Sequence, residues 1–283
     1  MYGFQIEGLR EPERFLVPVE PAAPTLTIVH EAREPFVDRA LEPGTVRVEP
    51  DKAELWMGDG DRILLDRATL TARFVTRERF DDEVLLHPYL GLPAAIASHW
   101  LGRQTLHGGA FRRGGGAWAV VGARAAGKSS ILAWVLQHGH EVMTDDILIL
   151  ERGHLFAGPR SVDLRGEAAV RLGGEELGVV GSRSRWRLRP EAVPPRAPLA
   201  GLVHLRWDDR IAIDPLRPPD RLEAIVQHCV IRPRREESLA YLELASLPAW
   251  RFTRPRNLDA LDGANTELLD ALGASDPPSG AVE

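Results

Sequence analysis

One short stretch constrains the fold of this chain more than any other, the sequence GARAAGKSS from Gly122 to Ser130. It follows the apolar run AWAVV and precedes SSILAWVLQHG, which has the apolar spacing of a helix and ends at a glycine. A strand that passes through a glycine-bearing loop directly into a helix is the context in which the pattern GxxxxGK[ST] binds phosphate. The sequence therefore predicts an α/β fold organised around a phosphate-binding loop.

The loop residues have physical roles that follow from this geometry. Backbone N–H groups and the positive end of the following helix would surround a β-phosphate, and Lys128 would bridge the β- and γ-oxygens. The Ser129 hydroxyl would ligate Mg²⁺, and Ser130 either contacts the α-phosphate or only begins the helix. We therefore expect Mg²⁺ and a nucleoside triphosphate, ATP or GTP, as ligands, with nucleotide contacts from Gly122, Arg124, Ala125, Ala126, Gly127, Lys128, Ser129 and Ser130.

Two residues of the loop are unusual. Lys128 is one of only two lysines among 35 basic residues, and a compact ammonium group fits between phosphate oxygens where a planar guanidinium does not simply replace it. Ala125 stands where such loops often carry glycine, and alanine disfavours backbone conformations with positive φ. The lysine supports phosphate binding, and the alanine raises a question about the loop's backbone.

A pair of acids, Asp145-Asp146, interrupts the apolar strand EVMTDDILIL soon after the loop helix. A magnesium site needs a hard carboxylate oxygen near Ser129, and phosphoryl transfer needs a base that orients a hydroxyl. Neighbouring residues on a strand point to opposite faces, so both acids can serve only where the strand bulges or ends. An acidic turn without a ligand is the alternative.

His107 is the third candidate. The sequence QTLHGGAFRR, the glycines Gly114 to Gly116 and AWAVVG together indicate a β-hairpin. With a three-residue turn, Arg113 would pair with Ala117, and His107 would lie opposite Ala123 at the loop entrance. A histidine there could stabilise phosphate charge or assist proton transfer, although strand histidines often have only a structural role.

Composition excludes several other classes of protein. A net charge of −6 argues against a nucleic-acid binder, because that affinity needs clustered positive charge. The single cysteine, Cys229, cannot form an internal disulfide, and no apolar run is long enough to span a bilayer. The start MYGF lacks the features of a secretory signal. We expect a cytoplasmic protein without nucleic-acid or membrane partners.

The chain divides into three predicted parts. Residues 1–85 form a β-rich, mostly antiparallel N-terminal region, with β-forming runs FLVPV, TLTIV, TVRV, AELWM, RILL and TLTARFV. Residues 86–272 form the domain that carries the phosphate loop, beginning with a buried helix in LHPYLGLPAAIASHWLG and ending with a helix near residues 258–272. Residues 273–283 are expected to be a disordered tail.

The order LHGGAF, GARAAGKSS and MTDDILIL resembles the HPr kinase/phosphorylase superfamily, including its HPr-kinase-like members in peptide natural-product clusters such as lasso-peptide serine kinases. The resemblance is strongest over residues 86–165 and weaker to residue 272. It implies an HPr-kinase-like (PEP carboxykinase-like) P-loop core and assigns the family's histidine to His107. It further implies that Asp145 orients the acceptor hydroxyl and that Asp146 supports magnesium.

The resemblance implies an ATP- and Mg²⁺-dependent kinase whose partner is a peptide or small protein with a serine hydroxyl, with a homo-oligomer as a further possibility. The loop by which HPr kinases engage HPr is not identifiable, and the β-rich start differs from theirs, so HPr itself is not the expected acceptor. A small-molecule kinase on the same core and a nucleotide-binding regulator without transferase activity are the alternatives.

Arginines after the acidic pair supply a last set of candidates. In GPRSVDLR, Arg160 is favoured over Arg165 as the residue that neutralises the transferred phosphoryl group. The basic runs RSRWRLR, RPRR and RFTRPR are typical of solvated faces, although one of them could recognise an acidic peptide or a nucleotide phosphate.

Overall fold

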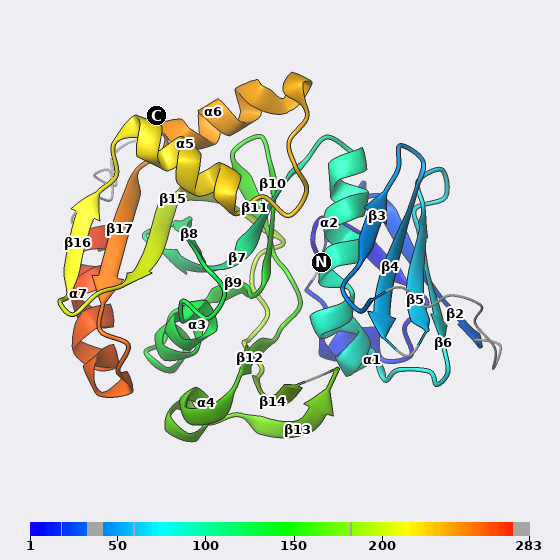
Figure 1. Cartoon of the computed structure of the whole chain (residues 1–283), viewed down its shortest axis with the longest axis horizontal. Coiled ribbons are helices and arrows are strands. Elements are labelled where there is room, and N and C mark those ends of the chain that lie inside the picture. Colours follow the sequence, from blue (N-terminus) through cyan, green and yellow to red (C-terminus); the bar gives the residue numbers. More distant parts are fainter. Residues whose placement is uncertain (18, 33–41, 59, 182, 274–283) are drawn as a thin grey trace.

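The computed structural model describes residues 1–17, 19–32, 42–58, 60–181 and 183–273. These residues form a mixed α/β protein with three sheets (Figure 1). The expected tail lies outside the described residues, except for Gly273, which is the last residue of the final helix. No helix among the described residues is both long and apolar enough to cross a membrane.

The N-terminal sheet has six strands in the order β1-β2-β6-β5-β4-β3. Three of its five pairings are antiparallel, and the pairs β1–β2 and β2–β6 are parallel. Five of the six predicted runs are strands, but FLVPV is not, although Phe15 and Val17 are buried; Pro18 lies outside the described residues. The strands are β1 Gln5–Glu7, β2 Thr25–Ala32, β3 Val46–Val48, β4 Lys52–Gly58, β5 Asp61–Asp66 and β6 Thr71–Thr76.

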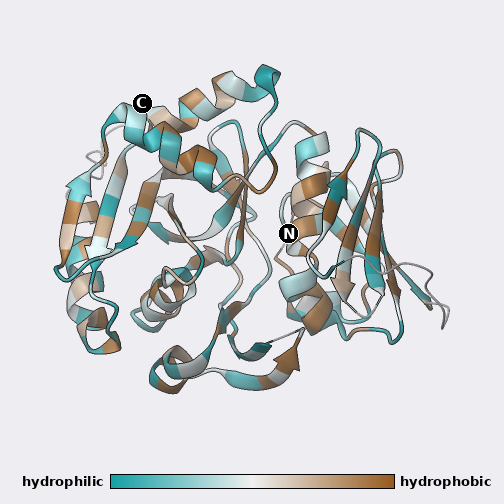
Figure 2. Cartoon of the chain, in the orientation of Figure 1, coloured by the Kyte–Doolittle hydropathy of each residue, from teal (hydrophilic) through white to brown (hydrophobic). Residues whose placement is uncertain are grey.

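Helix α2, Gly91–Trp100, lies between this sheet and the rest of the protein (Figure 1). Nine of its ten residues are buried, Ser98 and His99 among them, and Figure 2 colours the helix with both apolar (brown) and paler or hydrophilic residues. The predicted helix began at residue 86, but a short helical turn at Asp82–Val84 (α1) and an irregular turn at Leu85–Tyr89 precede α2.

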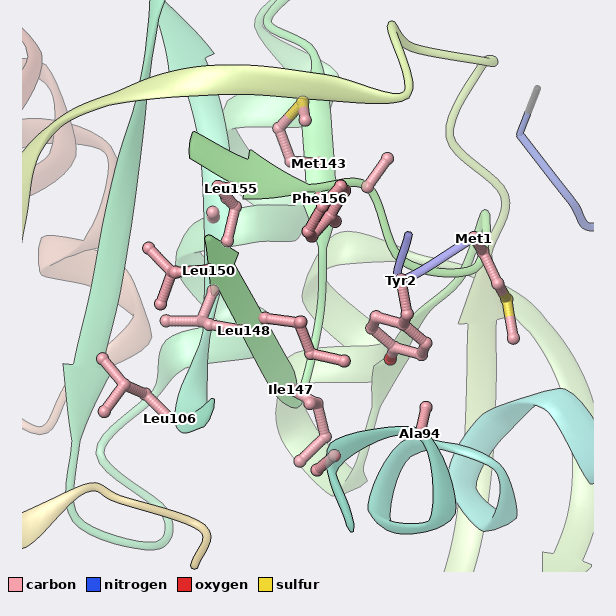
Figure 3. Packing of buried hydrophobic residues seen from close by; sticks show 14 of the residues in the cluster. Met1, Tyr2, Ala94, Leu106, Met143, Ile147, Leu148, Leu150, Leu155 and Phe156 are labelled. Carbon is pink, nitrogen blue, oxygen red and sulfur yellow. The ribbon is translucent and has the colours of Figure 1, made fainter. Parts of the chain in front are cut away.

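The first residues of the chain pack against the larger half of the protein. Tyr2 is fully buried, and its backbone N–H donates to the Ala157 carbonyl at 2.6 Å. Figure 3 shows its ring between the segment that carries Phe156 and the helix that carries Ala94. One continuous core therefore joins residues of the N-terminal sheet, α2 and the central sheet.

The central sheet contains eight strands in the order β11-β10-β7-β8-β15-β17-β16, with β9 paired to β7. Strands β8, β15 and β17 are parallel, and β7 runs antiparallel to β8. The strands are β7 Gln104–Arg113, β8 Gly116–Gly122, β9 Val142–Thr144, β10 Ile147–Glu151, β11 His154–Phe156, β15 Arg196–Trp207, β16 Ala212–Pro215 and β17 Ala249–Arg254.

Two further layers complete the fold. A three-stranded sheet in the order β12-β14-β13 lies with helix α4 at the lower edge of Figure 1, and α3 packs between it and α7. Helices α5 and α6 lie on the opposite side. The bounds are α3 Lys128–Gln137, β12 Val162–Leu164, α4 Gly166–Leu172, β13 Glu175–Val180, β14 Arg183–Leu188, α5 Pro218–Gln227, α6 Ser238–Ser246 and α7 Leu261–Gly273.

The hairpin that precedes the phosphate loop has a different register from the predicted one. Arg113 pairs with Gly116, because the turn contains only Gly114 and Gly115, both with positive φ (58° and 84°). Such left-handed pairs match the twist of a two-residue hairpin. The β7–β8 ladder therefore begins at Gly108, one residue after His107, and His107 pairs instead with Ile147 of β10. The prediction that it faces Ala123 was wrong by one residue.

The hairpin leaves no room for a side chain at Gly108. A Cβ there would come within 2.6 Å of the Val120 carbonyl oxygen and 2.9 Å of a Leu148 methyl carbon. We expect Gly108→Ala to lower the free energy of unfolding by about 1–3 kcal/mol, as other overpacked cores do. Gly263→Ala is the matched control, since a Cβ on that α7 residue meets nothing within 4 Å. Urea denaturation of both variants tests this, and equal midpoints would contradict it.

Candidate phosphate-binding and catalytic site

Three parallel strands end at the same edge of the central sheet. Leu205 of β15 pairs with Gly122 at the end of β8, and Trp207 at the end of β15 pairs with Arg254 at the end of β17. In open α/β sheets, ligands bind outside the carboxyl ends of the strands. The predicted phosphate loop leaves the sheet at this edge, between β7 on one side and β15 on the other.

The loop has a defined backbone conformation. Gly127 precedes helix α3 with φ +82°, and Ala125 has φ +62°, the region that alanine disfavours. The Lys128 ammonium donates to the carbonyls of Gly122 at 2.9 Å and Ala123 at 3.1 Å. Burial lowers the pKa of Lys128, and the charges of Asp145 and Asp146 oppose that shift. The Lys128 ammonium group is thus held in place by backbone carbonyl groups of the loop.

The acidic pair occupies the break between β9 and β10, as the sequence predicted. Asp146 has φ +74°, so the chain turns there and the two side chains do not alternate as on a regular strand. Asp145 is buried and accepts a hydrogen bond from the Ser129 hydroxyl at 3.1 Å. Asp146 is 43% exposed, and its carboxylate lies 3.4 Å from Nδ1 of His107.

His107 reaches this turn from the neighbouring strand. Its partner in the β7–β10 ladder is Ile147, directly after the acidic pair, and Gly108 donates its N–H to the Asp146 carbonyl at 3.0 Å. Burial lowers the pKa of His107, the charge of Asp146 raises it and the charge of Lys128 lowers it further. The net direction favours a neutral imidazole, which can take up a proton.

A cavity of about 1130 Å³ brings the predicted residues together. Its wall includes His107, both acids and the loop from Arg124 to Ser130; Gly122 lies beneath, at the end of β8. Cations on the wall outnumber acids. The basic residues are Arg124, Lys128, Arg165, Arg171, Arg183, Arg185, Arg254 and Arg256, and the acidic ones are Asp145, Asp146, Asp163, Glu167 and Asp259. This surplus of positive charge suits a polyanionic ligand.

The predicted arginine, Arg160, does not reach the cavity. Its Nε donates to the Pro190 carbonyl at 3.0 Å, and its other end lies 3.6 Å from Glu191. Arg165, the alternative in the same segment, lines the cavity instead. The difference arises because Arg160 precedes β12, whereas Arg165 follows it and begins α4 at the cavity rim.

Sequence reasoning gave too little weight to two basic runs. The first six residues of RSRWRLR form β14, from which Arg183 and Arg185 line the cavity, and RFTRPR contributes Arg254 and Arg256. Arg185 and the buried Arg187 both bind Asp163, at 3.0 and 2.7 Å. Burial alone would raise the pKa of Asp163, but His87 and these arginines lower it. Only the pairing of β14 with β12 brings these charges together.

The donor set fits a magnesium ion held partly by substrate. No cluster of three or more His, Cys, Asp or Glu side chains able to hold a metal occurs among the described residues. Mg²⁺ commonly uses one or two carboxylates together with substrate phosphates and water, so a full protein cage is not required. The Ser129 hydroxyl and Asp145 carboxylate, already in contact, supply such a partial set.

Comparison with known proteins finds similarity among solved structures but not among family models or curated proteins. No family model matches the sequence, and no curated protein matches it. Among solved structures, the chain is similar to the Hpr(Ser) kinase/phosphatase from Coxiella burnetii, at 14% identity over 62% of this chain and 99% of that chain, with a TM-score of 0.31. Because the TM-score is this low, the similarity carries no information about the activity or the site residues of this protein.

The left-handed backbone at Ala125 has a measurable cost. We expect Ala125→Gly to raise the free energy of unfolding by about 1 kcal/mol, because glycine adopts positive φ without steric penalty. Ala123→Gly is the matched control: its φ is not positive, and glycine there should lower stability by roughly 0.4–1 kcal/mol. Thermal unfolding of both variants in nucleotide-free buffer tests this, and a destabilised Ala125→Gly protein would contradict it.

Asp145 makes stability depend on pH. Burial, then the charge of Asp146, raises the pKa of Asp145 from 3.8 to about 7, and the Ser129 hydrogen bond opposes the shift. A raised folded-state pKa means that the carboxyl's contribution is lost as pH rises from about 4 to about 7. Asp145→Asn should therefore become more stable than the unmodified protein over this range, by on the order of 4 kcal/mol above pH 7.

Asp163→Asn provides the control of opposite sign. Its carboxyl has a lowered pKa, so its stabilising effect is present at neutral pH and disappears as pH falls below about 4. Denaturant midpoints from about pH 2 to about pH 8, without divalent cations, measure both variants, because the Asp163 effect is lost only below about pH 4. If the advantage of Asp145→Asn did not grow with pH, the carboxylate would not be destabilised by burial.

Proposed function

We propose that this protein is an ATP- and Mg²⁺-dependent phosphotransferase that moves the γ-phosphoryl group to a serine-type hydroxyl. The observation that carries the proposal is the meeting of three elements in one cavity: Lys128 in its loop, the Ser129–Asp145 hydrogen bond at 3.1 Å, and the Asp146–His107 contact at 3.4 Å. A site that only bound nucleotide would not need the last pair.

The reaction divides among these groups. The acceptor hydroxyl oxygen forms a bond to the γ-phosphorus, the bond from that phosphorus to the β–γ bridging oxygen breaks, and ADP departs. The hydroxyl proton passes to the carboxylate or imidazole beside it. Lys128 and the loop stabilise the negative charge on the phosphoryl oxygens, and Mg²⁺ when bound neutralises charge on the β- and γ-oxygens.

The geometry favours a different division of the two acids from the one that the resemblance implied. Asp145 is buried against Ser129, which suits a metal-side role. Asp146 is 43% exposed beside a 40% exposed His107, which suits contact with an incoming hydroxyl. We therefore propose that Asp145 and Ser129 hold magnesium and that Asp146, assisted by His107, orients the acceptor.

The shape and charge of the cavity support a peptide or small-protein acceptor. Its volume of about 1130 Å³ lies above the range of about 300–1,000 Å³ for small-ligand pockets, which leaves space for a second substrate beside a nucleotide. Arg165 and Arg183 stand on its wall as candidate contacts for an acidic or carboxylate-bearing acceptor. Tailoring of a peptide natural product is the role that we favour.

A matched pair of variants tests both the reaction and the division of roles. The full-length protein is incubated with labelled ATP, Mg²⁺ and peptides that carry serine at internal or terminal positions, and phosphoserine is identified by mass spectrometry. Asp146→Asn should lower kcat by about 10²–10⁴-fold with unchanged Mg²⁺ dependence, because it removes the proton acceptor. Asp145→Asn should instead raise the Mg²⁺ concentration needed for half-maximal rate.

Each contrary result has a meaning. Exchange of the two phenotypes would restore the assignment in which Asp145 orients the acceptor. Transfer only to free hydroxylated metabolites would indicate a small-molecule kinase. Slow release of free phosphate with every acceptor would contradict transferase activity and favour a nucleotide-binding regulator.

A further inference from the structure

The cavity continues beyond the loop, on the side away from the acidic pair. Strand β7, which carries His107, flanks β8 on one side, and β15, which ends at Trp207, flanks it on the other. Because β8 separates them, Trp207 and its neighbour Arg254 lie across the loop from the reacting groups, although they line the same cavity. The reaction proposed above uses neither residue.

Arg254 is a buried cation without a carboxylate partner among the described residues. It is 2% exposed, and its Nη2 donates to the carbonyls of Ala126 at 2.9 Å and Gly127 at 3.5 Å. Its Nη1 is buried and has no hydrogen-bond partner in the described part of the chain. Burial lowers the pKa of Arg254 to about 10. The Arg254 guanidinium, fixed in this way, supports the loop backbone at Ala126 and Gly127.

The Trp207 ring lies against the Arg254 guanidinium. The Arg254 guanidinium carbon is 4.4 Å from the centre of the Trp207 ring, and the indole N–H donates to the Ala125 carbonyl at 3.2 Å. A Cβ added to Gly127 would come within 3.1 Å of the indole, so the ring is packed against the loop. Yet 38% of Trp207 remains exposed, which makes it one of the large apolar side chains not covered by the protein.

The segment after β17 extends the same wall with apolar residues. Pro255, Leu258 and Leu261 line the cavity together with Trp207. An aromatic ring held rigidly at a cavity wall, with apolar neighbours, is a suitable surface for a planar base, since base–aromatic stacking needs only a π-face. Arginine beneath the ring adds cation–π stabilisation to the support itself.

We propose that Trp207 is the stacking platform for the base of the bound nucleoside triphosphate. The proposal deepens the nucleotide site and rests on the proposed function for the placement of the triphosphate on the loop. With the γ-phosphoryl group directed to Asp146 and His107, the base has to leave the loop on the other side, where Trp207 stands. Stacking discriminates weakly among bases, so ATP and GTP should bind comparably.

The test compares a ligand that has a base with one that lacks it. Calorimetry of the full-length protein measures the Kd of Mg-ATP and of magnesium tripolyphosphate, which occupies the loop without a base. Trp207→Ala should weaken ATP binding by about 5- to 150-fold and leave tripolyphosphate binding unchanged. Trp207→Phe, which keeps a ring but loses the N–H donor, should lose less.

Fluorescence gives a second readout that does not depend on the folding of the alanine variant. ATP should change the tryptophan emission of the unmodified protein, tripolyphosphate should not, and Trp207→Phe should abolish the ATP signal. Trp250→Phe is the matched control, since Trp250 lies on the adjacent strand β17 and outside the cavity lining; its ATP signal should persist.

The outcomes separate this proposal from the kinase assignment. Equal weakening of ATP and tripolyphosphate by Trp207→Ala would mean that the ring acts only through the loop, and no weakening of either would mean that the base lies elsewhere; each result overturns the stacking role. Selective weakening of ATP in a protein that transfers no phosphoryl group would retain the base site and overturn the kinase function.

Discussion

The position of strand β8 between β7 and β15 is the constraint on which the site depends. Its antiparallel partner presents His107 near the acidic turn, and its parallel partner ends at Trp207. The phosphate loop leaves from the end of β8 itself. A shift of one residue in either ladder would turn side chains to the opposite face, so the registers fix which groups share the cavity.

Charge balance in the cavity is incomplete in the protein alone. The Lys128 ammonium group donates to backbone carbonyls at the start of the loop, and the Arg254 guanidinium donates to the carbonyl of Ala126 in the same loop. Asp145 is buried with its pKa raised to about 7. Buried charges are usually paired or neutralised, and here polyphosphate and a divalent cation would supply the missing partners. The same feature underlies the expectation that the unliganded site lowers the stability of the protein while its charges are arranged for binding.

Short-range patterns predicted most of the elements. The loop, helix α3 and the break at the acidic pair follow from spacing, glycine positions and alternation within about ten residues. The predictions were wrong where the local sequence is compatible with two different backbone structures. Three glycines allow either a two- or a three-residue turn, and only the packing of the hairpin selects the former. FLVPV has strand-like composition, but its buried Phe15 and Val17 pack without joining a sheet.

The sequence by itself determined that a glycine-bearing loop joins a strand to a helix at residues 122–128, because the requirements of such a loop are local and involve contiguous residues. It also indicated that His107, Asp145 and Asp146 belong with that loop. Only the tertiary structure decided which arginines join them: Arg165, Arg185 and Arg254 reach the cavity while Arg160 does not. Their positions depend on strand pairings between distant segments, such as β12 with β14 and β15 with β17, which no local pattern encodes.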